Sequence, residues 1–140
     1  MDHATLFADL VFAEVRLLDL VNDRLESEIG LGVTSYLPLQ VVGAVPNCRV
    51  QDVAHELGIS VGGASKAVDR LELARLCRRR RHPTDRRSSI VLLTAAGRRT
   101  LASGQSVTHQ VLAETLGLSA SRQLALGNTL STLRQTLQGG

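Results

Sequence analysis

Apolar side chains recur at helical spacing from the start of the chain, and they form two stripes rather than one. Over residues 5–28 one stripe contains Leu17 and the other contains Val11, and both keep the period of an α-helix. A helix with two apolar faces needs two partners. We therefore expect one face to pack within the subunit and the other to meet a second subunit, and we expect the helix to end at Gly30.

Two shorter helices are expected next. The first spans about residues 35–45 and stops at Pro46, and Pro38 fits this helix only if it lies in the first turn. The second spans residues 49–57, keeps its apolar side chains on one face, and ends at Gly58.

A tight turn after Gly58 leads into a helix with a small and polar outer face. Ser60 can cap this helix, and its apolar positions are Val61, Ala64, Val68 and Leu71, the last three of which we expect in the core. Its other side carries Gly62, Gly63, Ser65, Lys66, Asp69 and Arg70. A short helix, a turn with glycine and a second helix of this kind form the helix-turn-helix pattern.

Beyond Ala74 the pattern changes from helical spacing to two short strands. In residues 75–81 apolar and polar side chains can alternate only over a short stretch, and residues 82–85 are of types common in turns. Residues 88–93 are β-branched at their centre, which is typical of a strand. The sequence therefore predicts a hairpin with a loop of about eight residues, which we interpret as a wing.

The remainder of the chain predicts two more helices. Thr94 caps a long helix that continues to Leu116, Gly117 breaks it, and Ser119 caps a last, leucine-rich helix. Both ends of the chain carry more apolar surface than a small winged domain needs. We therefore predict a mostly α fold of six helices with a small β-hairpin wing, a winged helix-turn-helix whose terminal helices form a dimerisation lobe.

Length and composition narrow the class of protein. A chain of 140 residues is long enough for one core, so we expect a single domain. Aromatic residues make up only 2% of the chain, which favours helix packing by aliphatic side chains over a β-sandwich. The sequence shows neither a signal-peptide pattern nor the roughly 18 apolar residues of a membrane span, so we expect a cytoplasmic protein without a membrane partner.

The charge is concentrated in one part of the chain. Residues 66–99 hold 11 of the 16 Lys and Arg residues and only 3 of the 13 Asp and Glu residues. Concentrated like charge destabilises a folded protein unless a polyanion compensates it. Since this segment includes the second half of the recognition helix and the wing, we expect the polyanion to be nucleic acid.

The residues do not predict an enzyme, a cofactor or a metal site. A Gly-rich phosphate loop after a strand and a nucleophile elbow are both missing from the sequence. The four histidines show none of the paired spacings of metal ligands. The two cysteines are expected to be free thiols, Cys77 as a buried apolar residue. Cys48 lies beside Arg49, which could lower its pKa, so sensing of oxidants remains an alternative.

The helix-turn-helix, the wing and the start of the next helix together resemble a known protein family. The stretch VQDVAHELGISVGGASKAVDRLELARLCRRRRHPTDRRSSIVLLTAAGRRTL, residues 50–101, resembles the MarR family of bacterial transcription regulators, and DRRSSIVLLTAAGR, residues 85–98, is its most specific part. The resemblance implies one MarR-like domain over residues 1–140. Its dimerisation helices would span about residues 5–28 and 95–138, and its DNA-binding lobe about residues 35–94.

The resemblance also implies a function. Members form triangular homodimers that place two recognition helices in successive major grooves of a pseudo-palindromic operator, with each wing at the flanking minor groove. Repression is the commoner outcome, and small, often phenolic or antibiotic-like ligands bind between the two lobes of many members. We therefore expect a repressor that binds double-stranded DNA as a homodimer and is relieved by such a ligand. A non-specific architectural DNA-binding protein and a cysteine-based redox sensor are the alternatives.

The expected DNA-binding residues fall into two groups. In the recognition helix they are Gly62, Gly63, Ser65, Lys66 and Arg70, and in the wing they are Arg79, Arg81, Asp85, Arg86 and Arg87. Lys66 is the candidate for base recognition, because an ammonium group can donate to guanine O6 and N7. By resemblance Arg87 would enter the minor groove and Asp85 would orient it. The other arginines of the wing are expected to contact phosphates.

Overall fold

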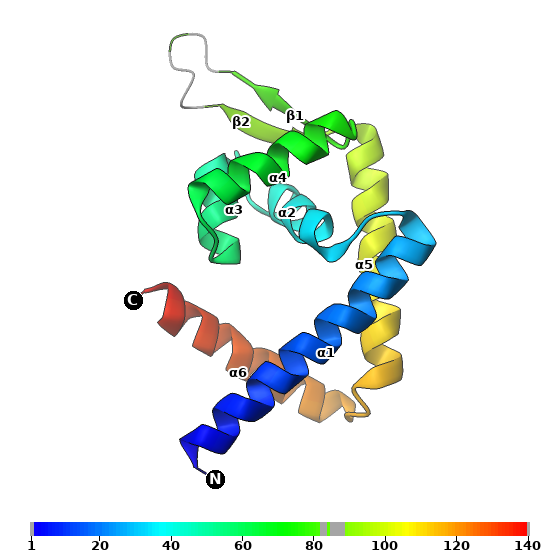
Figure 1. Ribbon diagram of the computed structural model, residues 1–140, viewed down its shortest axis with the longest axis vertical. Coiled ribbons are helices and arrows are strands. Elements are labelled where there is room, and N and C mark those ends of the chain that lie inside the picture. The colour runs from blue at the N-terminus through cyan, green and yellow to red at the C-terminus, as the bar shows by residue number, and fades with distance from the viewer. Residues whose placement is uncertain (1, 82–83, 85–88, 140) are drawn as a thin grey trace.

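The computed structural model describes residues 2–81, 84 and 89–139 (Figure 1). In chain order its elements are α1 (His3–Ile29), α2 (Val33–Ala44), α3 (Val50–Leu57), α4 (Val61–Leu73), β1 (Cys77–Arg80), β2 (Ile90–Leu93), α5 (Ala95–Thr115) and α6 (Ala120–Gln138). The two strands pair antiparallel, with Cys77 opposite Leu93 and Arg80 opposite Ile90. The predicted fold of six helices and one hairpin is therefore confirmed.

Local capping chemistry sets most of the helix ends. The Ser60 hydroxyl accepts the backbone N–H of Gly63 at 3.0 Å, and the Thr94 hydroxyl accepts that of Gly97 at 2.9 Å. Ser119 caps α6 in the same way. Three turns are closed by glycines in the left-handed region, Gly30, Gly58 and Gly117, where a residue without Cβ is least strained. These boundaries agree with the sequence predictions.

Helix α2 departs from its prediction at the N-terminal end. The helix begins at Val33, so Pro38 lies beyond the first turn, and the expectation for Pro38 is wrong. The earlier start has a tertiary cause, because Asn22 of α1 caps α2 by accepting the backbone N–H of Val33 at 2.9 Å. Pro38 cannot donate to the carbonyl four residues before it, but its ring is buried together with Tyr36 and other apolar side chains of α2.

The core lies between the second half of α1, helices α2 to α5 and the hairpin. Its most deeply buried side chains include Leu25, Leu39, Val53, Val68, Leu71, Val91 and Val111. Two glycines of α5 permit close approach. A Cβ at Gly97 would lie 1.9 Å from the carbonyl oxygen of Leu76, and one at Gly104 would lie 2.5 Å from the ring of Tyr36. Small residues at these two points therefore let α5 pack directly on the hairpin and on α2.

The two terminal helices lie away from the wing, at the opposite end of α5 (Figure 1). Helix α1 packs against α5, but its buried side chains, Val21 and Leu25, lie only in its second half. Helix α6 has no buried side chain among the residues that the structure describes. Large apolar side chains are therefore exposed on both helices: Leu6, Phe7, Leu10, Val11, Phe12, Val15, Leu18 and Leu20 on α1, and Leu124, Leu126, Leu130, Leu133 and Leu137 on α6.

Candidate nucleic-acid interface

The recognition helix α4 presents its polar residues outward. Ala64, Val68 and Leu71 are buried, as predicted, and this fixes the face that carries the other side chains. Lys66 and Arg70 are exposed, and Ser65 is half-buried. The structure thus brings these three candidates to the outer side of one helix.

The start of α4 differs from the sequence prediction. Val61 belongs to the apolar repeat, yet its side chain is 54% exposed, because the helix begins before it reaches the core and Ala64 is the first residue to pack there. Gly62 is exposed, and a Cβ at this position would meet no atom within 4 Å. Gly63 is half-buried, and a Cβ there would lie 3.2 Å from the Ser60 hydroxyl. The first turn of α4 therefore offers backbone that a partner can approach closely.

The arginines of the wing strand β1 face two sides. Cys77 is buried and Arg79 half-buried on one side, while Arg78 and Arg80 are exposed on the other, and Arg81 beyond the strand is exposed. Side chains alternate along a strand, so the arginine run cannot act as one patch. Asp85, Arg86 and Arg87, the predicted residues of the wing tip, lie outside the described residues.

Arg79 has carboxylate partners within the protein. Its guanidinium donates to Asp69 Oδ1 at 2.8 Å and also to Glu72 Oε1, while Glu72 Oε2 accepts the backbone N–H of Arg79 at 3.3 Å. Burial by itself would lower the pKa of Arg79, but the hydrogen bonds and charges of both carboxylates outweigh it and raise that pKa. Because Asp69 and Glu72 belong to α4, this cluster, which we call the Arg79 clamp, ties the wing strand to the recognition helix.

A groove of about 410 Å³ lies between the start of α3, the start of α4 and the wing. Its lining comprises Arg49, Val50, Gln51, Val61, Ser65, Arg79, Arg81 and Ser89. Arg49 and Gln51 were not among the predicted DNA-binding residues. Their place in the first turn of the helix that precedes the recognition helix is the sequence signal that could have indicated them.

The two cysteines are buried and free. Desolvation, with smaller contributions from Asp52 and Glu56, raises the pKa of the Cys48 thiol to about 11. Desolvation also raises the pKa of Cys77 to about 12. The lowering of the Cys48 pKa by Arg49, which the sequence left open, is therefore not found, because burial, Asp52 and Glu56 all raise that pKa. A neutral thiol is a poor nucleophile, so this geometry does not favour sensing of oxidants.

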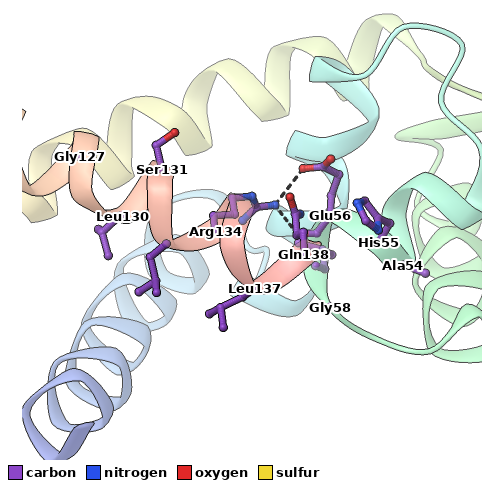
Figure 2. A pocket seen from close by; sticks show the side chains of 12 residues that line it. Ala54, His55, Glu56, Gly58, Gly127, Leu130, Ser131, Arg134, Leu137 and Gln138 are labelled. Atoms are coloured by element: carbon purple, nitrogen blue, oxygen red, sulfur yellow. Dashed lines mark hydrogen bonds and ion pairs between the residues drawn. The ribbon is translucent and has the colours of Figure 1, made fainter. Parts of the chain in front are cut away.

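A second groove, of about 840 Å³, separates α6 from the end of α3 (Figure 2). Leucines of α6 line it, among them Leu130 and Leu137, together with His55 of α3. Arg134 crosses the groove. Its guanidinium donates to the backbone carbonyl of Glu56 and, at 2.9 Å, to the carboxylate of the same residue. This ion pair joins residues 78 positions apart, and it connects a terminal helix with the helix-turn-helix.

Within the described part of the chain, the acidic, histidine and cysteine side chains form no group that could hold a metal ion. None of the described helices has the length and hydropathy needed to cross a membrane.

Comparison with known proteins gives a consistent family. A model of the MarR family matches residues 29–88. The chain is 26% identical over 110 residues to the HTH-type transcriptional regulator BilQ of Clostridium symbiosum, covering 79% of this chain and 75% of BilQ. The match to the family model includes α2, α3, α4 and β1, and so contains the helix-turn-helix.

Solved structures agree with this assignment. The transcriptional repressor CouR bound to a 23-mer DNA duplex shares 29% identity with this chain at a TM-score of 0.78, over 89% of both chains. BpsR of Bordetella bronchiseptica, whose DNA binding is regulated by 6-hydroxynicotinic acid, shares 21% identity at a TM-score of 0.81, over 92% of this chain and 98% of BpsR. In its family match over residues 29–88, in its sequence similarity to BilQ and in its fold, the chain resembles the MarR family of transcription regulators.

Proposed function

We propose that this protein is a homodimeric repressor that recognises a pseudo-palindromic operator in duplex DNA. One observation carries the proposal. Helix α4 and the hairpin lie toward one end of the molecule and α1 and the start of α6 lie toward the other (Figure 1); basic side chains are exposed on the first pair and large apolar side chains on the second. The first surface suits a polyanion and the second suits a protein partner. The similarity to CouR, a transcriptional repressor bound to a DNA duplex, supports the same function.

At the DNA surface we assign different tasks to the side chains. Ser65, Lys66 and Arg70 would contact base edges and phosphates in the major groove, with Lys66 donating to guanine. Gly62 would let the backbone approach the DNA, since the space beside it is open. Arg81 would bind a phosphate and so position the protein without selecting sequence.

The predicted wing tip would complete the DNA surface. Arg87, oriented by Asp85, would insert into the minor groove and respond to its width and negative potential. Arg86 would bind a phosphate beside it. These three assignments rest on the family resemblance of this segment.

We assign the exposed apolar side chains of α1, together with Leu124 and Leu126 of α6, to a second copy of the chain. Single exposed apolar side chains are ordinary, but a large set of them on two helices indicates an interaction surface. A symmetric dimer also explains why the operator would be pseudo-palindromic, because two identical recognition helices face two half-sites.

Relief by a small ligand is part of the proposal, and the groove between α3 and α6 is its site. In BpsR, the protein of similar fold, a small aromatic acid regulates DNA binding. In this chain the apolar lining of the groove suits a phenolic or similar body, and Arg134 and Glu56 hold the lobes together across it (Figure 2). A ligand that separates this ion pair would shift α3, and with it α4, relative to the dimer.

The experiment is selection of duplexes from a random pool, followed by footprinting and competition binding at fixed salt. The proposed function requires one palindromic site preferred over bulk DNA by about 10³-fold or more. Lys66→Ala should weaken binding to this site about tenfold or more and relax its sequence preference. Arg122→Ala, an exposed arginine on α6, is the matched control and should bind as the unaltered protein does. Equal affinity for all duplexes would contradict the proposal.

A further inference from the structure

Val61 is an apolar residue on a polar surface. It is the first residue of α4, and more than half of its side chain is exposed, unlike the other members of its apolar repeat. Exposure by itself means little, because single apolar residues are common on protein surfaces. The exposure of Val61 is informative because this residue lies on the proposed DNA surface.

The neighbours of Val61 belong to the proposed DNA surface. It lines the groove between α3, α4 and the wing together with Arg49, Gln51 and Ser65, whose side chains suit phosphates or base edges. The other valine of this groove, Val50, is half-buried. Val61 is thus the more exposed of the two apolar residues in a groove whose other lining residues are charged or polar.

The backbone beside Val61 allows close contact. Gly62 follows it, and a Cβ at that position would meet nothing within 4 Å. Ser60 precedes it and caps the helix, which holds the first turn in a defined conformation. Since a recognition helix places its N-terminal residues at the base edges, Val61 lies at the end of α4 that would enter the major groove.

In the major groove, only one of the four bases presents an apolar group to a side chain. In the major groove the four bases differ in donors and acceptors, and thymine alone carries a C5 methyl group, which apolar side chains recognise by direct contact. We propose that Val61 is a specificity-determining residue that contacts the C5 methyl of one thymine in each half-site of the operator. This inference rests on the proposed function and specifies which base, and which group of that base, Val61 would recognise.

The test is a double-mutant cycle in which the Val61 side chain and the thymine methyl group are removed separately and together, and the affinity for DNA is measured each time. In the duplex selected above, each thymine is replaced in turn by deoxyuridine, which removes only the C5 methyl. For the unaltered protein, one symmetric pair of thymines should show a loss of about fourfold in affinity per half-site, the value of one methyl group removed from water. For Val61→Ala the same replacement should have little effect.

A second variant serves as the control. Ile59→Ala shortens an apolar side chain that is also exposed but lies in the turn before α4, and it should keep the full penalty for deoxyuridine. If every thymine gives the same penalty in the unaltered protein and in the Val61→Ala variant, the inference is overturned while the operator remains. If the unaltered protein selects no duplex at all, the proposed function fails, and the inference fails with it.

Discussion

Arg79 offers the sharpest test of how the DNA surface is built. Sequence patterning predicts a phosphate contact, whereas the geometry supports a clamp that holds β1 against α4. Replacing Arg79 with methionine keeps most of the apolar stem and removes the guanidinium. Arg78→Met is the matched control, since Arg78 is the exposed neighbour on the opposite side of the same strand.

The size of the effect follows from the exposure of the three side chains. Arg79 is 21% exposed, while Asp69 is 58% and Glu72 is 33% exposed. Two ion pairs of this partly exposed kind contribute up to about 1 kcal/mol each. Without Arg79 the two carboxylates, three positions apart on α4, repel each other by a few tenths of a kcal/mol. We therefore expect Arg79→Met to lower the free energy of unfolding by about 1–2 kcal/mol, and Arg78→Met to leave it nearly unchanged.

Two measurements distinguish the clamp from a phosphate contact. Urea unfolding gives the free energy of unfolding, and operator binding between about 50 and 200 mM salt gives the slope of log K against log salt. A clamp predicts reduced stability with an unchanged slope. If Arg79 instead neutralises a phosphate, the Arg79→Met variant should show a slope that is less steep by about 0.9 for each copy of the chain, or by about 1.8 for a dimer. Unchanged stability together with this smaller slope would refute the clamp.

Three further predictions concern packing, assembly and pH. Gly97→Ala should destabilise the protein by about 3 kcal/mol or more in urea unfolding, because its Cβ meets the backbone carbonyl of Leu76 and no rotamer can relieve the overlap. Gly127→Ala on open α6 should instead be neutral or stabilising. Phe12→Arg should raise the dimer dissociation constant at least about 100-fold in sedimentation experiments, since each copy loses the burial of a phenyl ring; an unchanged dimer would exclude α1 from the interface. The buried Cys48 thiol has a raised pKa of about 11, so the unfolded chain ionises first and the free energy of unfolding should fall as the pH rises from about 9 to about 11. Constant stability over this interval would contradict burial of the thiol.

Much of the fold follows from chemistry that acts within a few residues. Ser60, Thr94 and Ser119 mark helix starts because a side-chain oxygen satisfies an amide three positions later. Gly30 and Gly58 mark helix ends because the chain there takes a left-handed conformation. Such signals are visible in the linear sequence, and the predicted order of helices and strands was confirmed.

The sequence also indicated where the DNA surface should be, although not how it is arranged. The core face of α4 follows from helical periodicity, so the outer position of Lys66 could be predicted. The exposure of Val61 could not, because periodicity does not say where along a helix the core begins. Arg49 was missed although its place in the first turn of α3 is visible in the sequence; that it lines one groove with the wing is a property of the assembled lobe.

The sequence by itself determined the elements, their order, the resemblance to the MarR family and the concentration of positive charge in residues 66–99. Tertiary structure decided that Asn22 starts α2, that Arg79 binds the carboxylates of α4, that Arg134 reaches Glu56, and that burial raises the pKa of Cys48. The physical reason is the range of the interactions. Capping and periodicity act between near neighbours in the chain, whereas ion pairs and desolvation depend on which distant segments the fold brings together.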